Sequence, residues 1–181
     1  MRNIKILTVL LFSVVLYQCQ KKDSQIEGVS STHKKSDHSL VLNVGKDLFS
    51  IPVHYMKLYK FNEQNYCNQN KAVSVIYDNQ LSSCFDYVKT INGKDIDDFL
   101  GTIKNPKTYG GEDIACFDTD YSLILYNIKD EVVGYINISE SCNKLISNPE
   151  IKEREFYSKS GLRKVGFSKK GKEKIKKILK I

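Results

Sequence analysis

The chain has few of the residues that most often carry enzyme chemistry. Of its 3 histidines, His33 and His38 lie in a polar stretch, so only His54 could be the base that a serine or cysteine nucleophile needs. The cysteines after residue 60 form no C-x-x-C pair and have no histidine nearby, which disfavours zinc. Gly110 and Gly111 lack the lysine and the spacing of a phosphate-binding loop. We therefore predict no catalytic residue, no metal and no cofactor.

The sequence also lacks, at its N-terminus, an apolar run long enough to span a bilayer, for which roughly 20 residues are needed. The apolar segment 6–17 is interrupted by Thr8 and Ser13 and follows the basic residues Arg2 and Lys5. A basic start followed by a short apolar segment is typical of an export signal. This segment is therefore predicted to direct export and to take no part in the fold.

Residues 16–19, LYQC, resemble the lipobox of bacterial lipoprotein precursors, with Gln18 where a small residue is commonest. The resemblance implies that residues 1–18 are removed and that Cys19 becomes the lipidated first residue, carrying acyl chains such as palmitate. Acyl chains contribute about 0.8 kcal/mol per buried methylene, which holds a small domain on a membrane. Residues 20–24 resemble the lysine-and-acid tag that sends some lipoproteins to the outer face of the outer membrane. The expected location is therefore the bacterial outer membrane, at its periplasmic face or at the cell surface.

After the anchor, a polar stretch precedes one domain. Residues 20–39 contain almost no large apolar side chains, so we expect a flexible tether, whereas residues 40–181 have the length of one domain. Strand-like and helix-like apolar patterns both occur in that domain. The expected fold is α+β, an antiparallel sheet of hairpins with one or two helices packed on it and a C-terminal helix.

Apolar alternation places the predicted strands. Residues 39–44 and 48–51 are expected to form a first hairpin, 72–77 a strand, and 81–91 a strand in preference to a helix. Gly110-Gly111 is expected to be a turn.

Capping residues and apolar spacing place two helices. The first is predicted to be capped by Asn92 and to end at Asn105-Pro106. The second is predicted to run from its cap, Ser168, to Lys180. The apolar residues expected on one face of the first helix are Ile96, Phe99, Leu100 and Ile103.

The clearest local pattern is a hairpin formed by residues 121–127 and 132–139. If Lys129-Asp130 is its loop, Leu123 lies opposite Ile136, and one face of the hairpin is apolar. The other face, which would include Val133, is half apolar. A helix or the C-terminal segment is therefore expected to cover part of it.

Four cysteines remain if Cys19 is lipidated, and they allow either two disulfides or free thiols. Sequence alone does not separate the three pairings of Cys67, Cys84, Cys116 and Cys142. Cys116 and Cys142 lie almost symmetrically about the predicted hairpin loop. A bulge near residues 118–120 would let them bridge the open end of the hairpin.

Four acidic residues remain as candidates for acid–base chemistry. Asp118 and Asp120 follow Glu112 and Asp113. Two carboxylates about 5–9 Å apart in a cleft could act as general acid and base, and their oxygens also suit a hard cation. The segment lacks the glycine and the distal glutamate of a calcium loop. A solvated turn is the favoured interpretation, and an envelope hydrolase is the alternative.

Positive charge is concentrated at the C-terminus. Residues 151–181 carry 12 Lys and Arg against 3 Asp and Glu, whereas residues 20–150 have a net charge of −4. The lysines of the closing helix could contact a polyanion such as acidic lipid headgroups, or they could be a solvated helix face. Few aromatic residues interleave with them, which disfavours nucleic acid. The residues proposed to contact an anion are Lys169, Lys170, Lys172, Lys176 and Lys177.

Residues 95–175 also resemble small uncharacterised bacterial envelope lipoproteins with a helix, a C-F strand start, a central hairpin and a closing helix. That resemblance implies no activity. The predicted function is a lipid-anchored, non-catalytic binding module of the cell envelope, of the inhibitor, immunity or assembly type. Its expected partners are the membrane, through the lipid anchor, and an envelope protein. Polyanion binding through the lysine-rich helix is the alternative.

Overall fold

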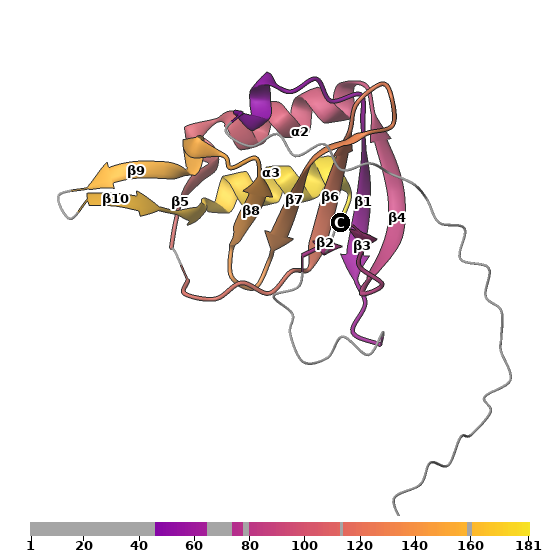
Figure 1. Cartoon of the computed structure of the whole chain (residues 1–181). Coiled ribbons are helices and arrows are strands. Elements are labelled where there is room, and N and C mark those ends of the chain that lie inside the picture. Colours follow the sequence, from indigo (N-terminus) through magenta and orange to yellow (C-terminus); the bar gives the residue numbers. More distant parts are fainter. Residues whose placement is uncertain (1–45, 65–73, 78–79, 113, 159–160) are drawn as a thin grey trace, which may run out of the picture. The chain divides into compact units, whose positions relative to one another are not determined.

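The computed structural model describes residues 46–64, 74–77, 80–112, 114–158 and 161–181. The signal peptide, Cys19, the tether, residues 39–44 and Cys67 lie outside these ranges. In chain order the elements drawn in Figure 1 are η2 (Leu48–Ser50), β1 (Tyr55–Phe61), β2 (Ile76–Tyr77), β3 (Gln80–Leu81), β4 (Phe85–Asn92), α2 (Lys94–Lys104), η3 (Pro106–Thr108), β5 (Tyr109–Gly111), β6 (Tyr121–Tyr126), β7 (Val132–Ser139), β8 (Lys144–Asn148), η4 (Lys152–Arg154), β9 (Glu155–Ser158), β10 (Gly161–Lys164), β11 (Gly166–Phe167) and α3 (Lys169–Leu179).

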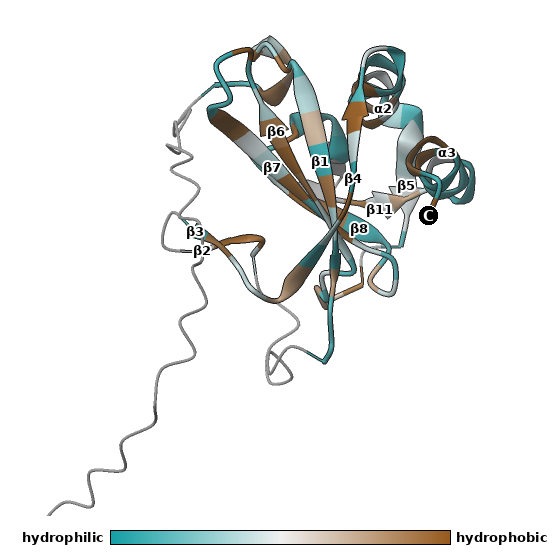
Figure 2. Cartoon of the chain, turned by 90° about the vertical axis from the view of Figure 1, so that its right-hand side faces the viewer, coloured by the Kyte–Doolittle hydropathy of each residue, from teal (hydrophilic) through white to brown (hydrophobic). Residues whose placement is uncertain are grey.

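The centre of the fold is an antiparallel sheet with the strand order β4-β1-β6-β7-β8. The short pairs β2-β3, β5-β11 and β9-β10 account for the other strands of the described residues. Both α2 and α3 lie on the same side of the five-stranded sheet (Figure 2). This arrangement confirms the α+β class, the packing of helices on an antiparallel sheet, and the C-terminal helix.

The main core fills the space between the sheet and the two helices. Ile96, Phe99 and Ile103 of α2 are three or four residues apart, so they share one buried face of the helix. Ile175 and Leu179 do the same on α3. The sheet contributes the side chains of Met56, Leu58, Leu123, Leu125, Ile136 and Leu145. The apolar spacing of the sequence therefore predicts both helical faces correctly.

A smaller core lies on the opposite face of the sheet. Tyr59 and Ile124 belong to it, and Val75 and Cys84, from the segment that contains β2 and β3, pack against them. The prediction that a helix or the C-terminal segment covers this face is wrong, because both helices pack on the other side. Both cores draw only on residues 48–181. A chain that starts at Gln20 therefore keeps every described core residue.

The β6-β7 hairpin has the predicted register over most of its length, with Leu123 paired to Ile136. The predicted two-residue loop is wrong, because a bulge at the end of β6 shifts the pairing and the connection comprises residues 127–131. The bulge also moves Val133 to the main core, away from the predicted face.

Two of the other local predictions are wrong. Residues 48–50 form a 3-10 helix instead of a strand, since the side chain of Asp47 accepts the N–H of Phe49 and caps a turn. Asn92 does not cap α2 but ends β4, and the capping position is taken by Gly93 with φ +56°. By contrast Ser168 caps α3 as predicted, with its Oγ accepting the N–H of Gly171.

Three further segments differ from or extend the predictions. Gly110 and Gly111 belong to β5 and do not form an isolated turn. A Cβ on Gly111 would lie 2.0 Å from the carbonyl oxygen of Phe167, so the close approach of β11 requires glycine there. Within the described part of residues 72–77, only Ile76–Tyr77 is a strand, and the β9-β10 hairpin was not predicted. The prediction that residues 81–91 form a strand and not a helix is correct where they belong to β4.

Candidate functional site

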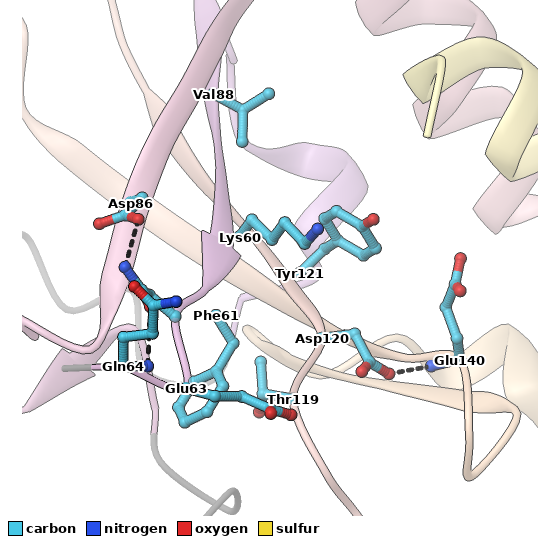
Figure 3. A pocket seen from close by; sticks show the side chains of 11 residues that line it. Lys60, Phe61, Glu63, Gln64, Asp86, Val88, Thr119, Asp120, Tyr121 and Glu140 are labelled. Atoms are coloured by element: carbon cyan, nitrogen blue, oxygen red, sulfur yellow. Dashed lines mark hydrogen bonds between the residues drawn. The ribbon is translucent and has the colours of Figure 1, made fainter. Parts of the chain in front are cut away.

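A concave site of about 610 Å³ lies at one end of the five-stranded sheet (Figure 3). Polar and charged side chains predominate in its wall. The residues that line it are Lys60, Phe61, Asn62, Glu63, Gln64, Asp86, Val88, Thr119, Asp120, Tyr121 and Glu140. We refer to it as the sheet-end site.

Antiparallel pairing brings these residues together from distant parts of the chain. β1 lies between β4 and β6, so Lys60 near its end is flanked by Asp86 on one side and Tyr121 on the other. β7 runs opposite to β6, which places Glu140, the residue after β7, beside Asp120, the residue before β6. The sheet-end site therefore exists only where these four strand ends meet.

Two carboxylates of the site are fixed by hydrogen bonds (Figure 3). The side-chain amide of Asn62 donates to Oδ2 of Asp86 at 2.6 Å, and the backbone N–H of Glu140 donates to Oδ2 of Asp120 at 2.7 Å. The carbonyl of Asp120 also accepts the N–H of Phe61. Hydrogen bonds to ionised carboxylates are short and strong. The wall therefore holds both carboxylates in defined positions.

Helix α3 neutralises one acid of the site. Nζ of Lys176 lies 3.0 Å from Oε1 of Glu140, and Nζ of Lys172 donates to the carbonyl of the same residue at 2.6 Å. Asp86 and Asp120 also line the site, and among the described lining residues Lys60 is the only one with a cationic side chain. The site is thus anionic and offers carboxylate acceptors to a cationic group.

The structure places the predicted acids differently from a catalytic pair. Asp120 lines the sheet-end site, but Asp118 does not, Glu112 is exposed outside it, and Asp113 lies outside the described residues. Within the described ranges no three His, Cys, Asp or Glu side chains gather as metal ligands. His54 is exposed at the opposite end of the sheet, where its backbone N–H donates to the carbonyl of Tyr126.

A stacked pair of tyrosines lies near His54, at that opposite end. The rings of Tyr55 and Tyr126 are 4.7 Å apart and almost parallel, and Nζ of Lys57 lies 4.9 Å from the centroid of Tyr126. Burial, together with the hydrogen bond that its hydroxyl donates to Asp130, raises the pKa of Tyr55 to about 12. The hydrogen bond from Tyr55 to Asp130 ties the β6-β7 loop to β1, and no sequence pattern indicated this contact.

One predicted disulfide is present. Cys116 and Cys142 are bonded, with their Cα atoms 5.6 Å apart. The predicted bulge is not needed, because both cysteines lie outside the paired residues of β6 and β7, in the segment before β6 and in the turn before β8. Cys84 is also disulfide-bonded, while Cys67 lies outside the described residues.

The predicted anion-contacting lysines fall into two groups. Lys169, Lys170 and Lys177 are exposed on α3, whereas Lys172 and Lys176 are half-buried and contact Glu140. The exposed lysines Lys174 and Lys180 belong with the first group although they were not among the predicted contacts.

Sequence reasoning missed Lys60, Glu63, Asp86 and Glu140 as neighbours, because no local spacing links them. Among the described residues, no helix has the length and apolar character that crossing a membrane requires. Comparison with models of known families, with curated proteins and with solved structures finds no match to this chain. Functional inference therefore rests on the chemistry of these surfaces.

Proposed function

We propose that this chain is a lipid-anchored binding module of the bacterial cell envelope, and that the sheet-end site receives a cationic group of an envelope protein. The observation that carries the proposal is the combination of a concave wall of about 610 Å³ with the carboxylates of Asp86 and Asp120. A lysine or arginine side chain entering this wall would gain charge-assisted hydrogen bonds.

The arrangement supports binding better than hydrolysis. A hydrolytic pair needs two carboxylates about 5–9 Å apart in one cleft. Asp118, the proposed partner of Asp120, does not line the site. The hydrolase alternative therefore gains no support from these residues.

The anchor is proposed from residues 16–19 alone. Metabolic labelling with an alkyne analogue of palmitate is expected to label the full chain at Cys19 and to fail for Cys19→Ser. Labelling of both proteins, or of neither, would remove the anchor from the proposal without touching the sheet-end site.

The sheet-end site is tested by cross-linking in cells. A photoreactive amino acid replaces Val88, at the rim of the site, or Ile128, in the β6-β7 loop. Ile128 is the control position. Its side chain is 77 % exposed against 45 % for Val88, so exposure alone would favour cross-linking at position 128. The expected result is a discrete protein adduct from position 88 that position 128 does not form.

Charge variants then separate a specific contact from chance proximity. Asp86→Asn with Asp120→Asn removes two charges from the wall while each residue keeps an oxygen that accepts its hydrogen bond. Asp97→Asn with Asp98→Asn removes two exposed charges from α2. The adduct should disappear in the first variant and persist in the second. Equal adducts from positions 88 and 128, or an adduct that survives the first variant, would refute the proposed site.

A further inference from the structure

The outer face of α3 is the most strongly charged surface of the described helices. Ile175 and Leu179 face the core, so the residues on the far side of the helix face solvent. Figure 2 shows this hydrophilic side of α3 turned away from the sheet. The exposed charged residues there are the lysines 169, 170, 174, 177 and 180, against the single acid Glu173.

The remaining lysines of α3 do not contribute to this face. Lys172 and Lys176 point to Glu140 and satisfy groups of the protein, as described above. α2, which packs beside α3, adds no net charge. The exposed charged residues of α2 and of the following turn are Lys94, Lys104 and Lys107 against Asp95, Asp97 and Asp98. The helical layer therefore presents a net charge of about +4, all of it from α3.

We propose that this outer face of α3 lies against anionic lipid headgroups and so orients the domain on a membrane. The face carries no pocket residue and no aromatic side chain. A row of long, flexible cations without a cavity suits a diffuse layer of lipid phosphates better than a discrete ligand. Nucleic acid is the less suitable polyanion, because single strands are held by stacking on aromatic rings.

The contact is independent of the sheet-end site. Lys172 and Lys176 contact Glu140 on the inner side of the helix. The outer lysines form no part of the sheet-end site, so they can meet a membrane whether that site is occupied or empty. It is also measurable without the acyl chain, so it does not depend on lipidation of Cys19. If Cys19 is acylated, the weak attraction of each lysine is sufficient, because the domain is already held at the surface.

Vesicle sedimentation tests the proposal on a chain that starts at Gln20 and retains the whole described core. The vesicles contain either equal parts phosphatidylglycerol and phosphatidylcholine or phosphatidylcholine alone. Binding is expected only to the anionic vesicles and should weaken as salt is raised from low to physiological concentration, because exposed charges are screened.

The variants Lys170→Gln and Lys177→Gln together should reduce binding to anionic vesicles roughly 25-fold, since each lysine near an anionic surface contributes a factor of about five. The matched control is Lys129→Gln with Lys152→Gln, which removes the same charge from exposed positions outside α3. Its binding should change much less. Glutamine has nearly the helix propensity of lysine, so the fold is expected to persist, and circular dichroism checks it.

Three results would overturn the proposal. These are equal binding to the two kinds of vesicle, an equal loss in the α3 variant and the control variant, and tighter binding of a DNA fragment than of anionic vesicles at the same salt. The second result would mean that net charge acts without a defined face. The third would assign the lysines to nucleic acid.

Discussion

Removing the Cys116–Cys142 disulfide tests whether the sheet-end site depends on a covalent tie. The bond joins cysteines 26 positions apart in the sequence. In the chain-entropy description, a disulfide that closes a loop of this length raises the free energy of the unfolded state by about 3.5 kcal/mol. The double variant Cys116→Ala and Cys142→Ala would remove this effect. A domain of this size has roughly 5–15 kcal/mol of stability in total. The double variant should therefore lose a large fraction of the protein's free energy of unfolding.

The same bond supports the wall of the site. Cys116 lies four residues before Asp120, and Cys142 lies two residues after Glu140. Without the bond, the two segments stay joined by the hydrogen bond from Glu140 N–H to Asp120 and by the one from Asp120 N–H to Ile138. Single hydrogen bonds contribute about 0.5–1.5 kcal/mol, or somewhat more to a charged group. The amides of Asp120 and Glu140 should therefore exchange hydrogen faster in the variant.

Guanidinium unfolding measures the loss of stability. It is monitored by tyrosine fluorescence, because the chain has no tryptophan. No reductant is added, so that the disulfide of Cys84 stays intact. Hydrogen exchange measures how fast the amides of Asp120 and Glu140 exchange in the double variant. A loss of stability below about 1 kcal/mol would refute the entropic argument. Unchanged exchange at Asp120 and Glu140 would show that the wall does not need the disulfide.

Two other predictions rest on single contacts. Gly171→Ala should destabilise the protein by about 1–3 kcal/mol, because its Cβ would lie 2.2 Å from the carbonyl oxygen of Thr108. Gly101→Ala, with open space around it, should stabilise by about 0.5–1 kcal/mol; thermal unfolding that ranks the pair the other way would contradict the packing of α3. In absorbance titration Tyr55 should ionise near pH 12, later than a free tyrosine at about pH 10. Because the folded-state pKa is the higher one, its contribution to stability is complete below pH 10 and is lost as pH rises to 12. Tyr55→Phe should remove one late-ionising group, and a titration identical to that of the parent chain would refute the late ionisation of Tyr55 and its hydrogen bond to Asp130.

Local patterns predicted what local physics controls. The register of the β6-β7 hairpin follows from the alternation of apolar residues along two neighbouring segments, so Leu123 and Ile136 could be paired correctly. The buried faces of α2 and α3 follow from helical spacing, and Ser168 could be recognised as a cap. Asn92 failed as a cap because the pairing of β1 with β4 extends to that residue and keeps it in a strand. Tertiary pairing there outweighed a local capping preference.

The sequence by itself determined the α+β class, the hairpin register and the concentration of lysines at the C-terminus. Only the tertiary structure decided that β1 lies between β4 and β6, and so brought Lys60, Asp86 and Asp120 into one wall. It also decided which lysines of α3 satisfy Glu140 and which face solvent. The physical reason is that residue spacing fixes which side chains share a face of one element, whereas the neighbour of that face depends on contacts between segments far apart in the chain.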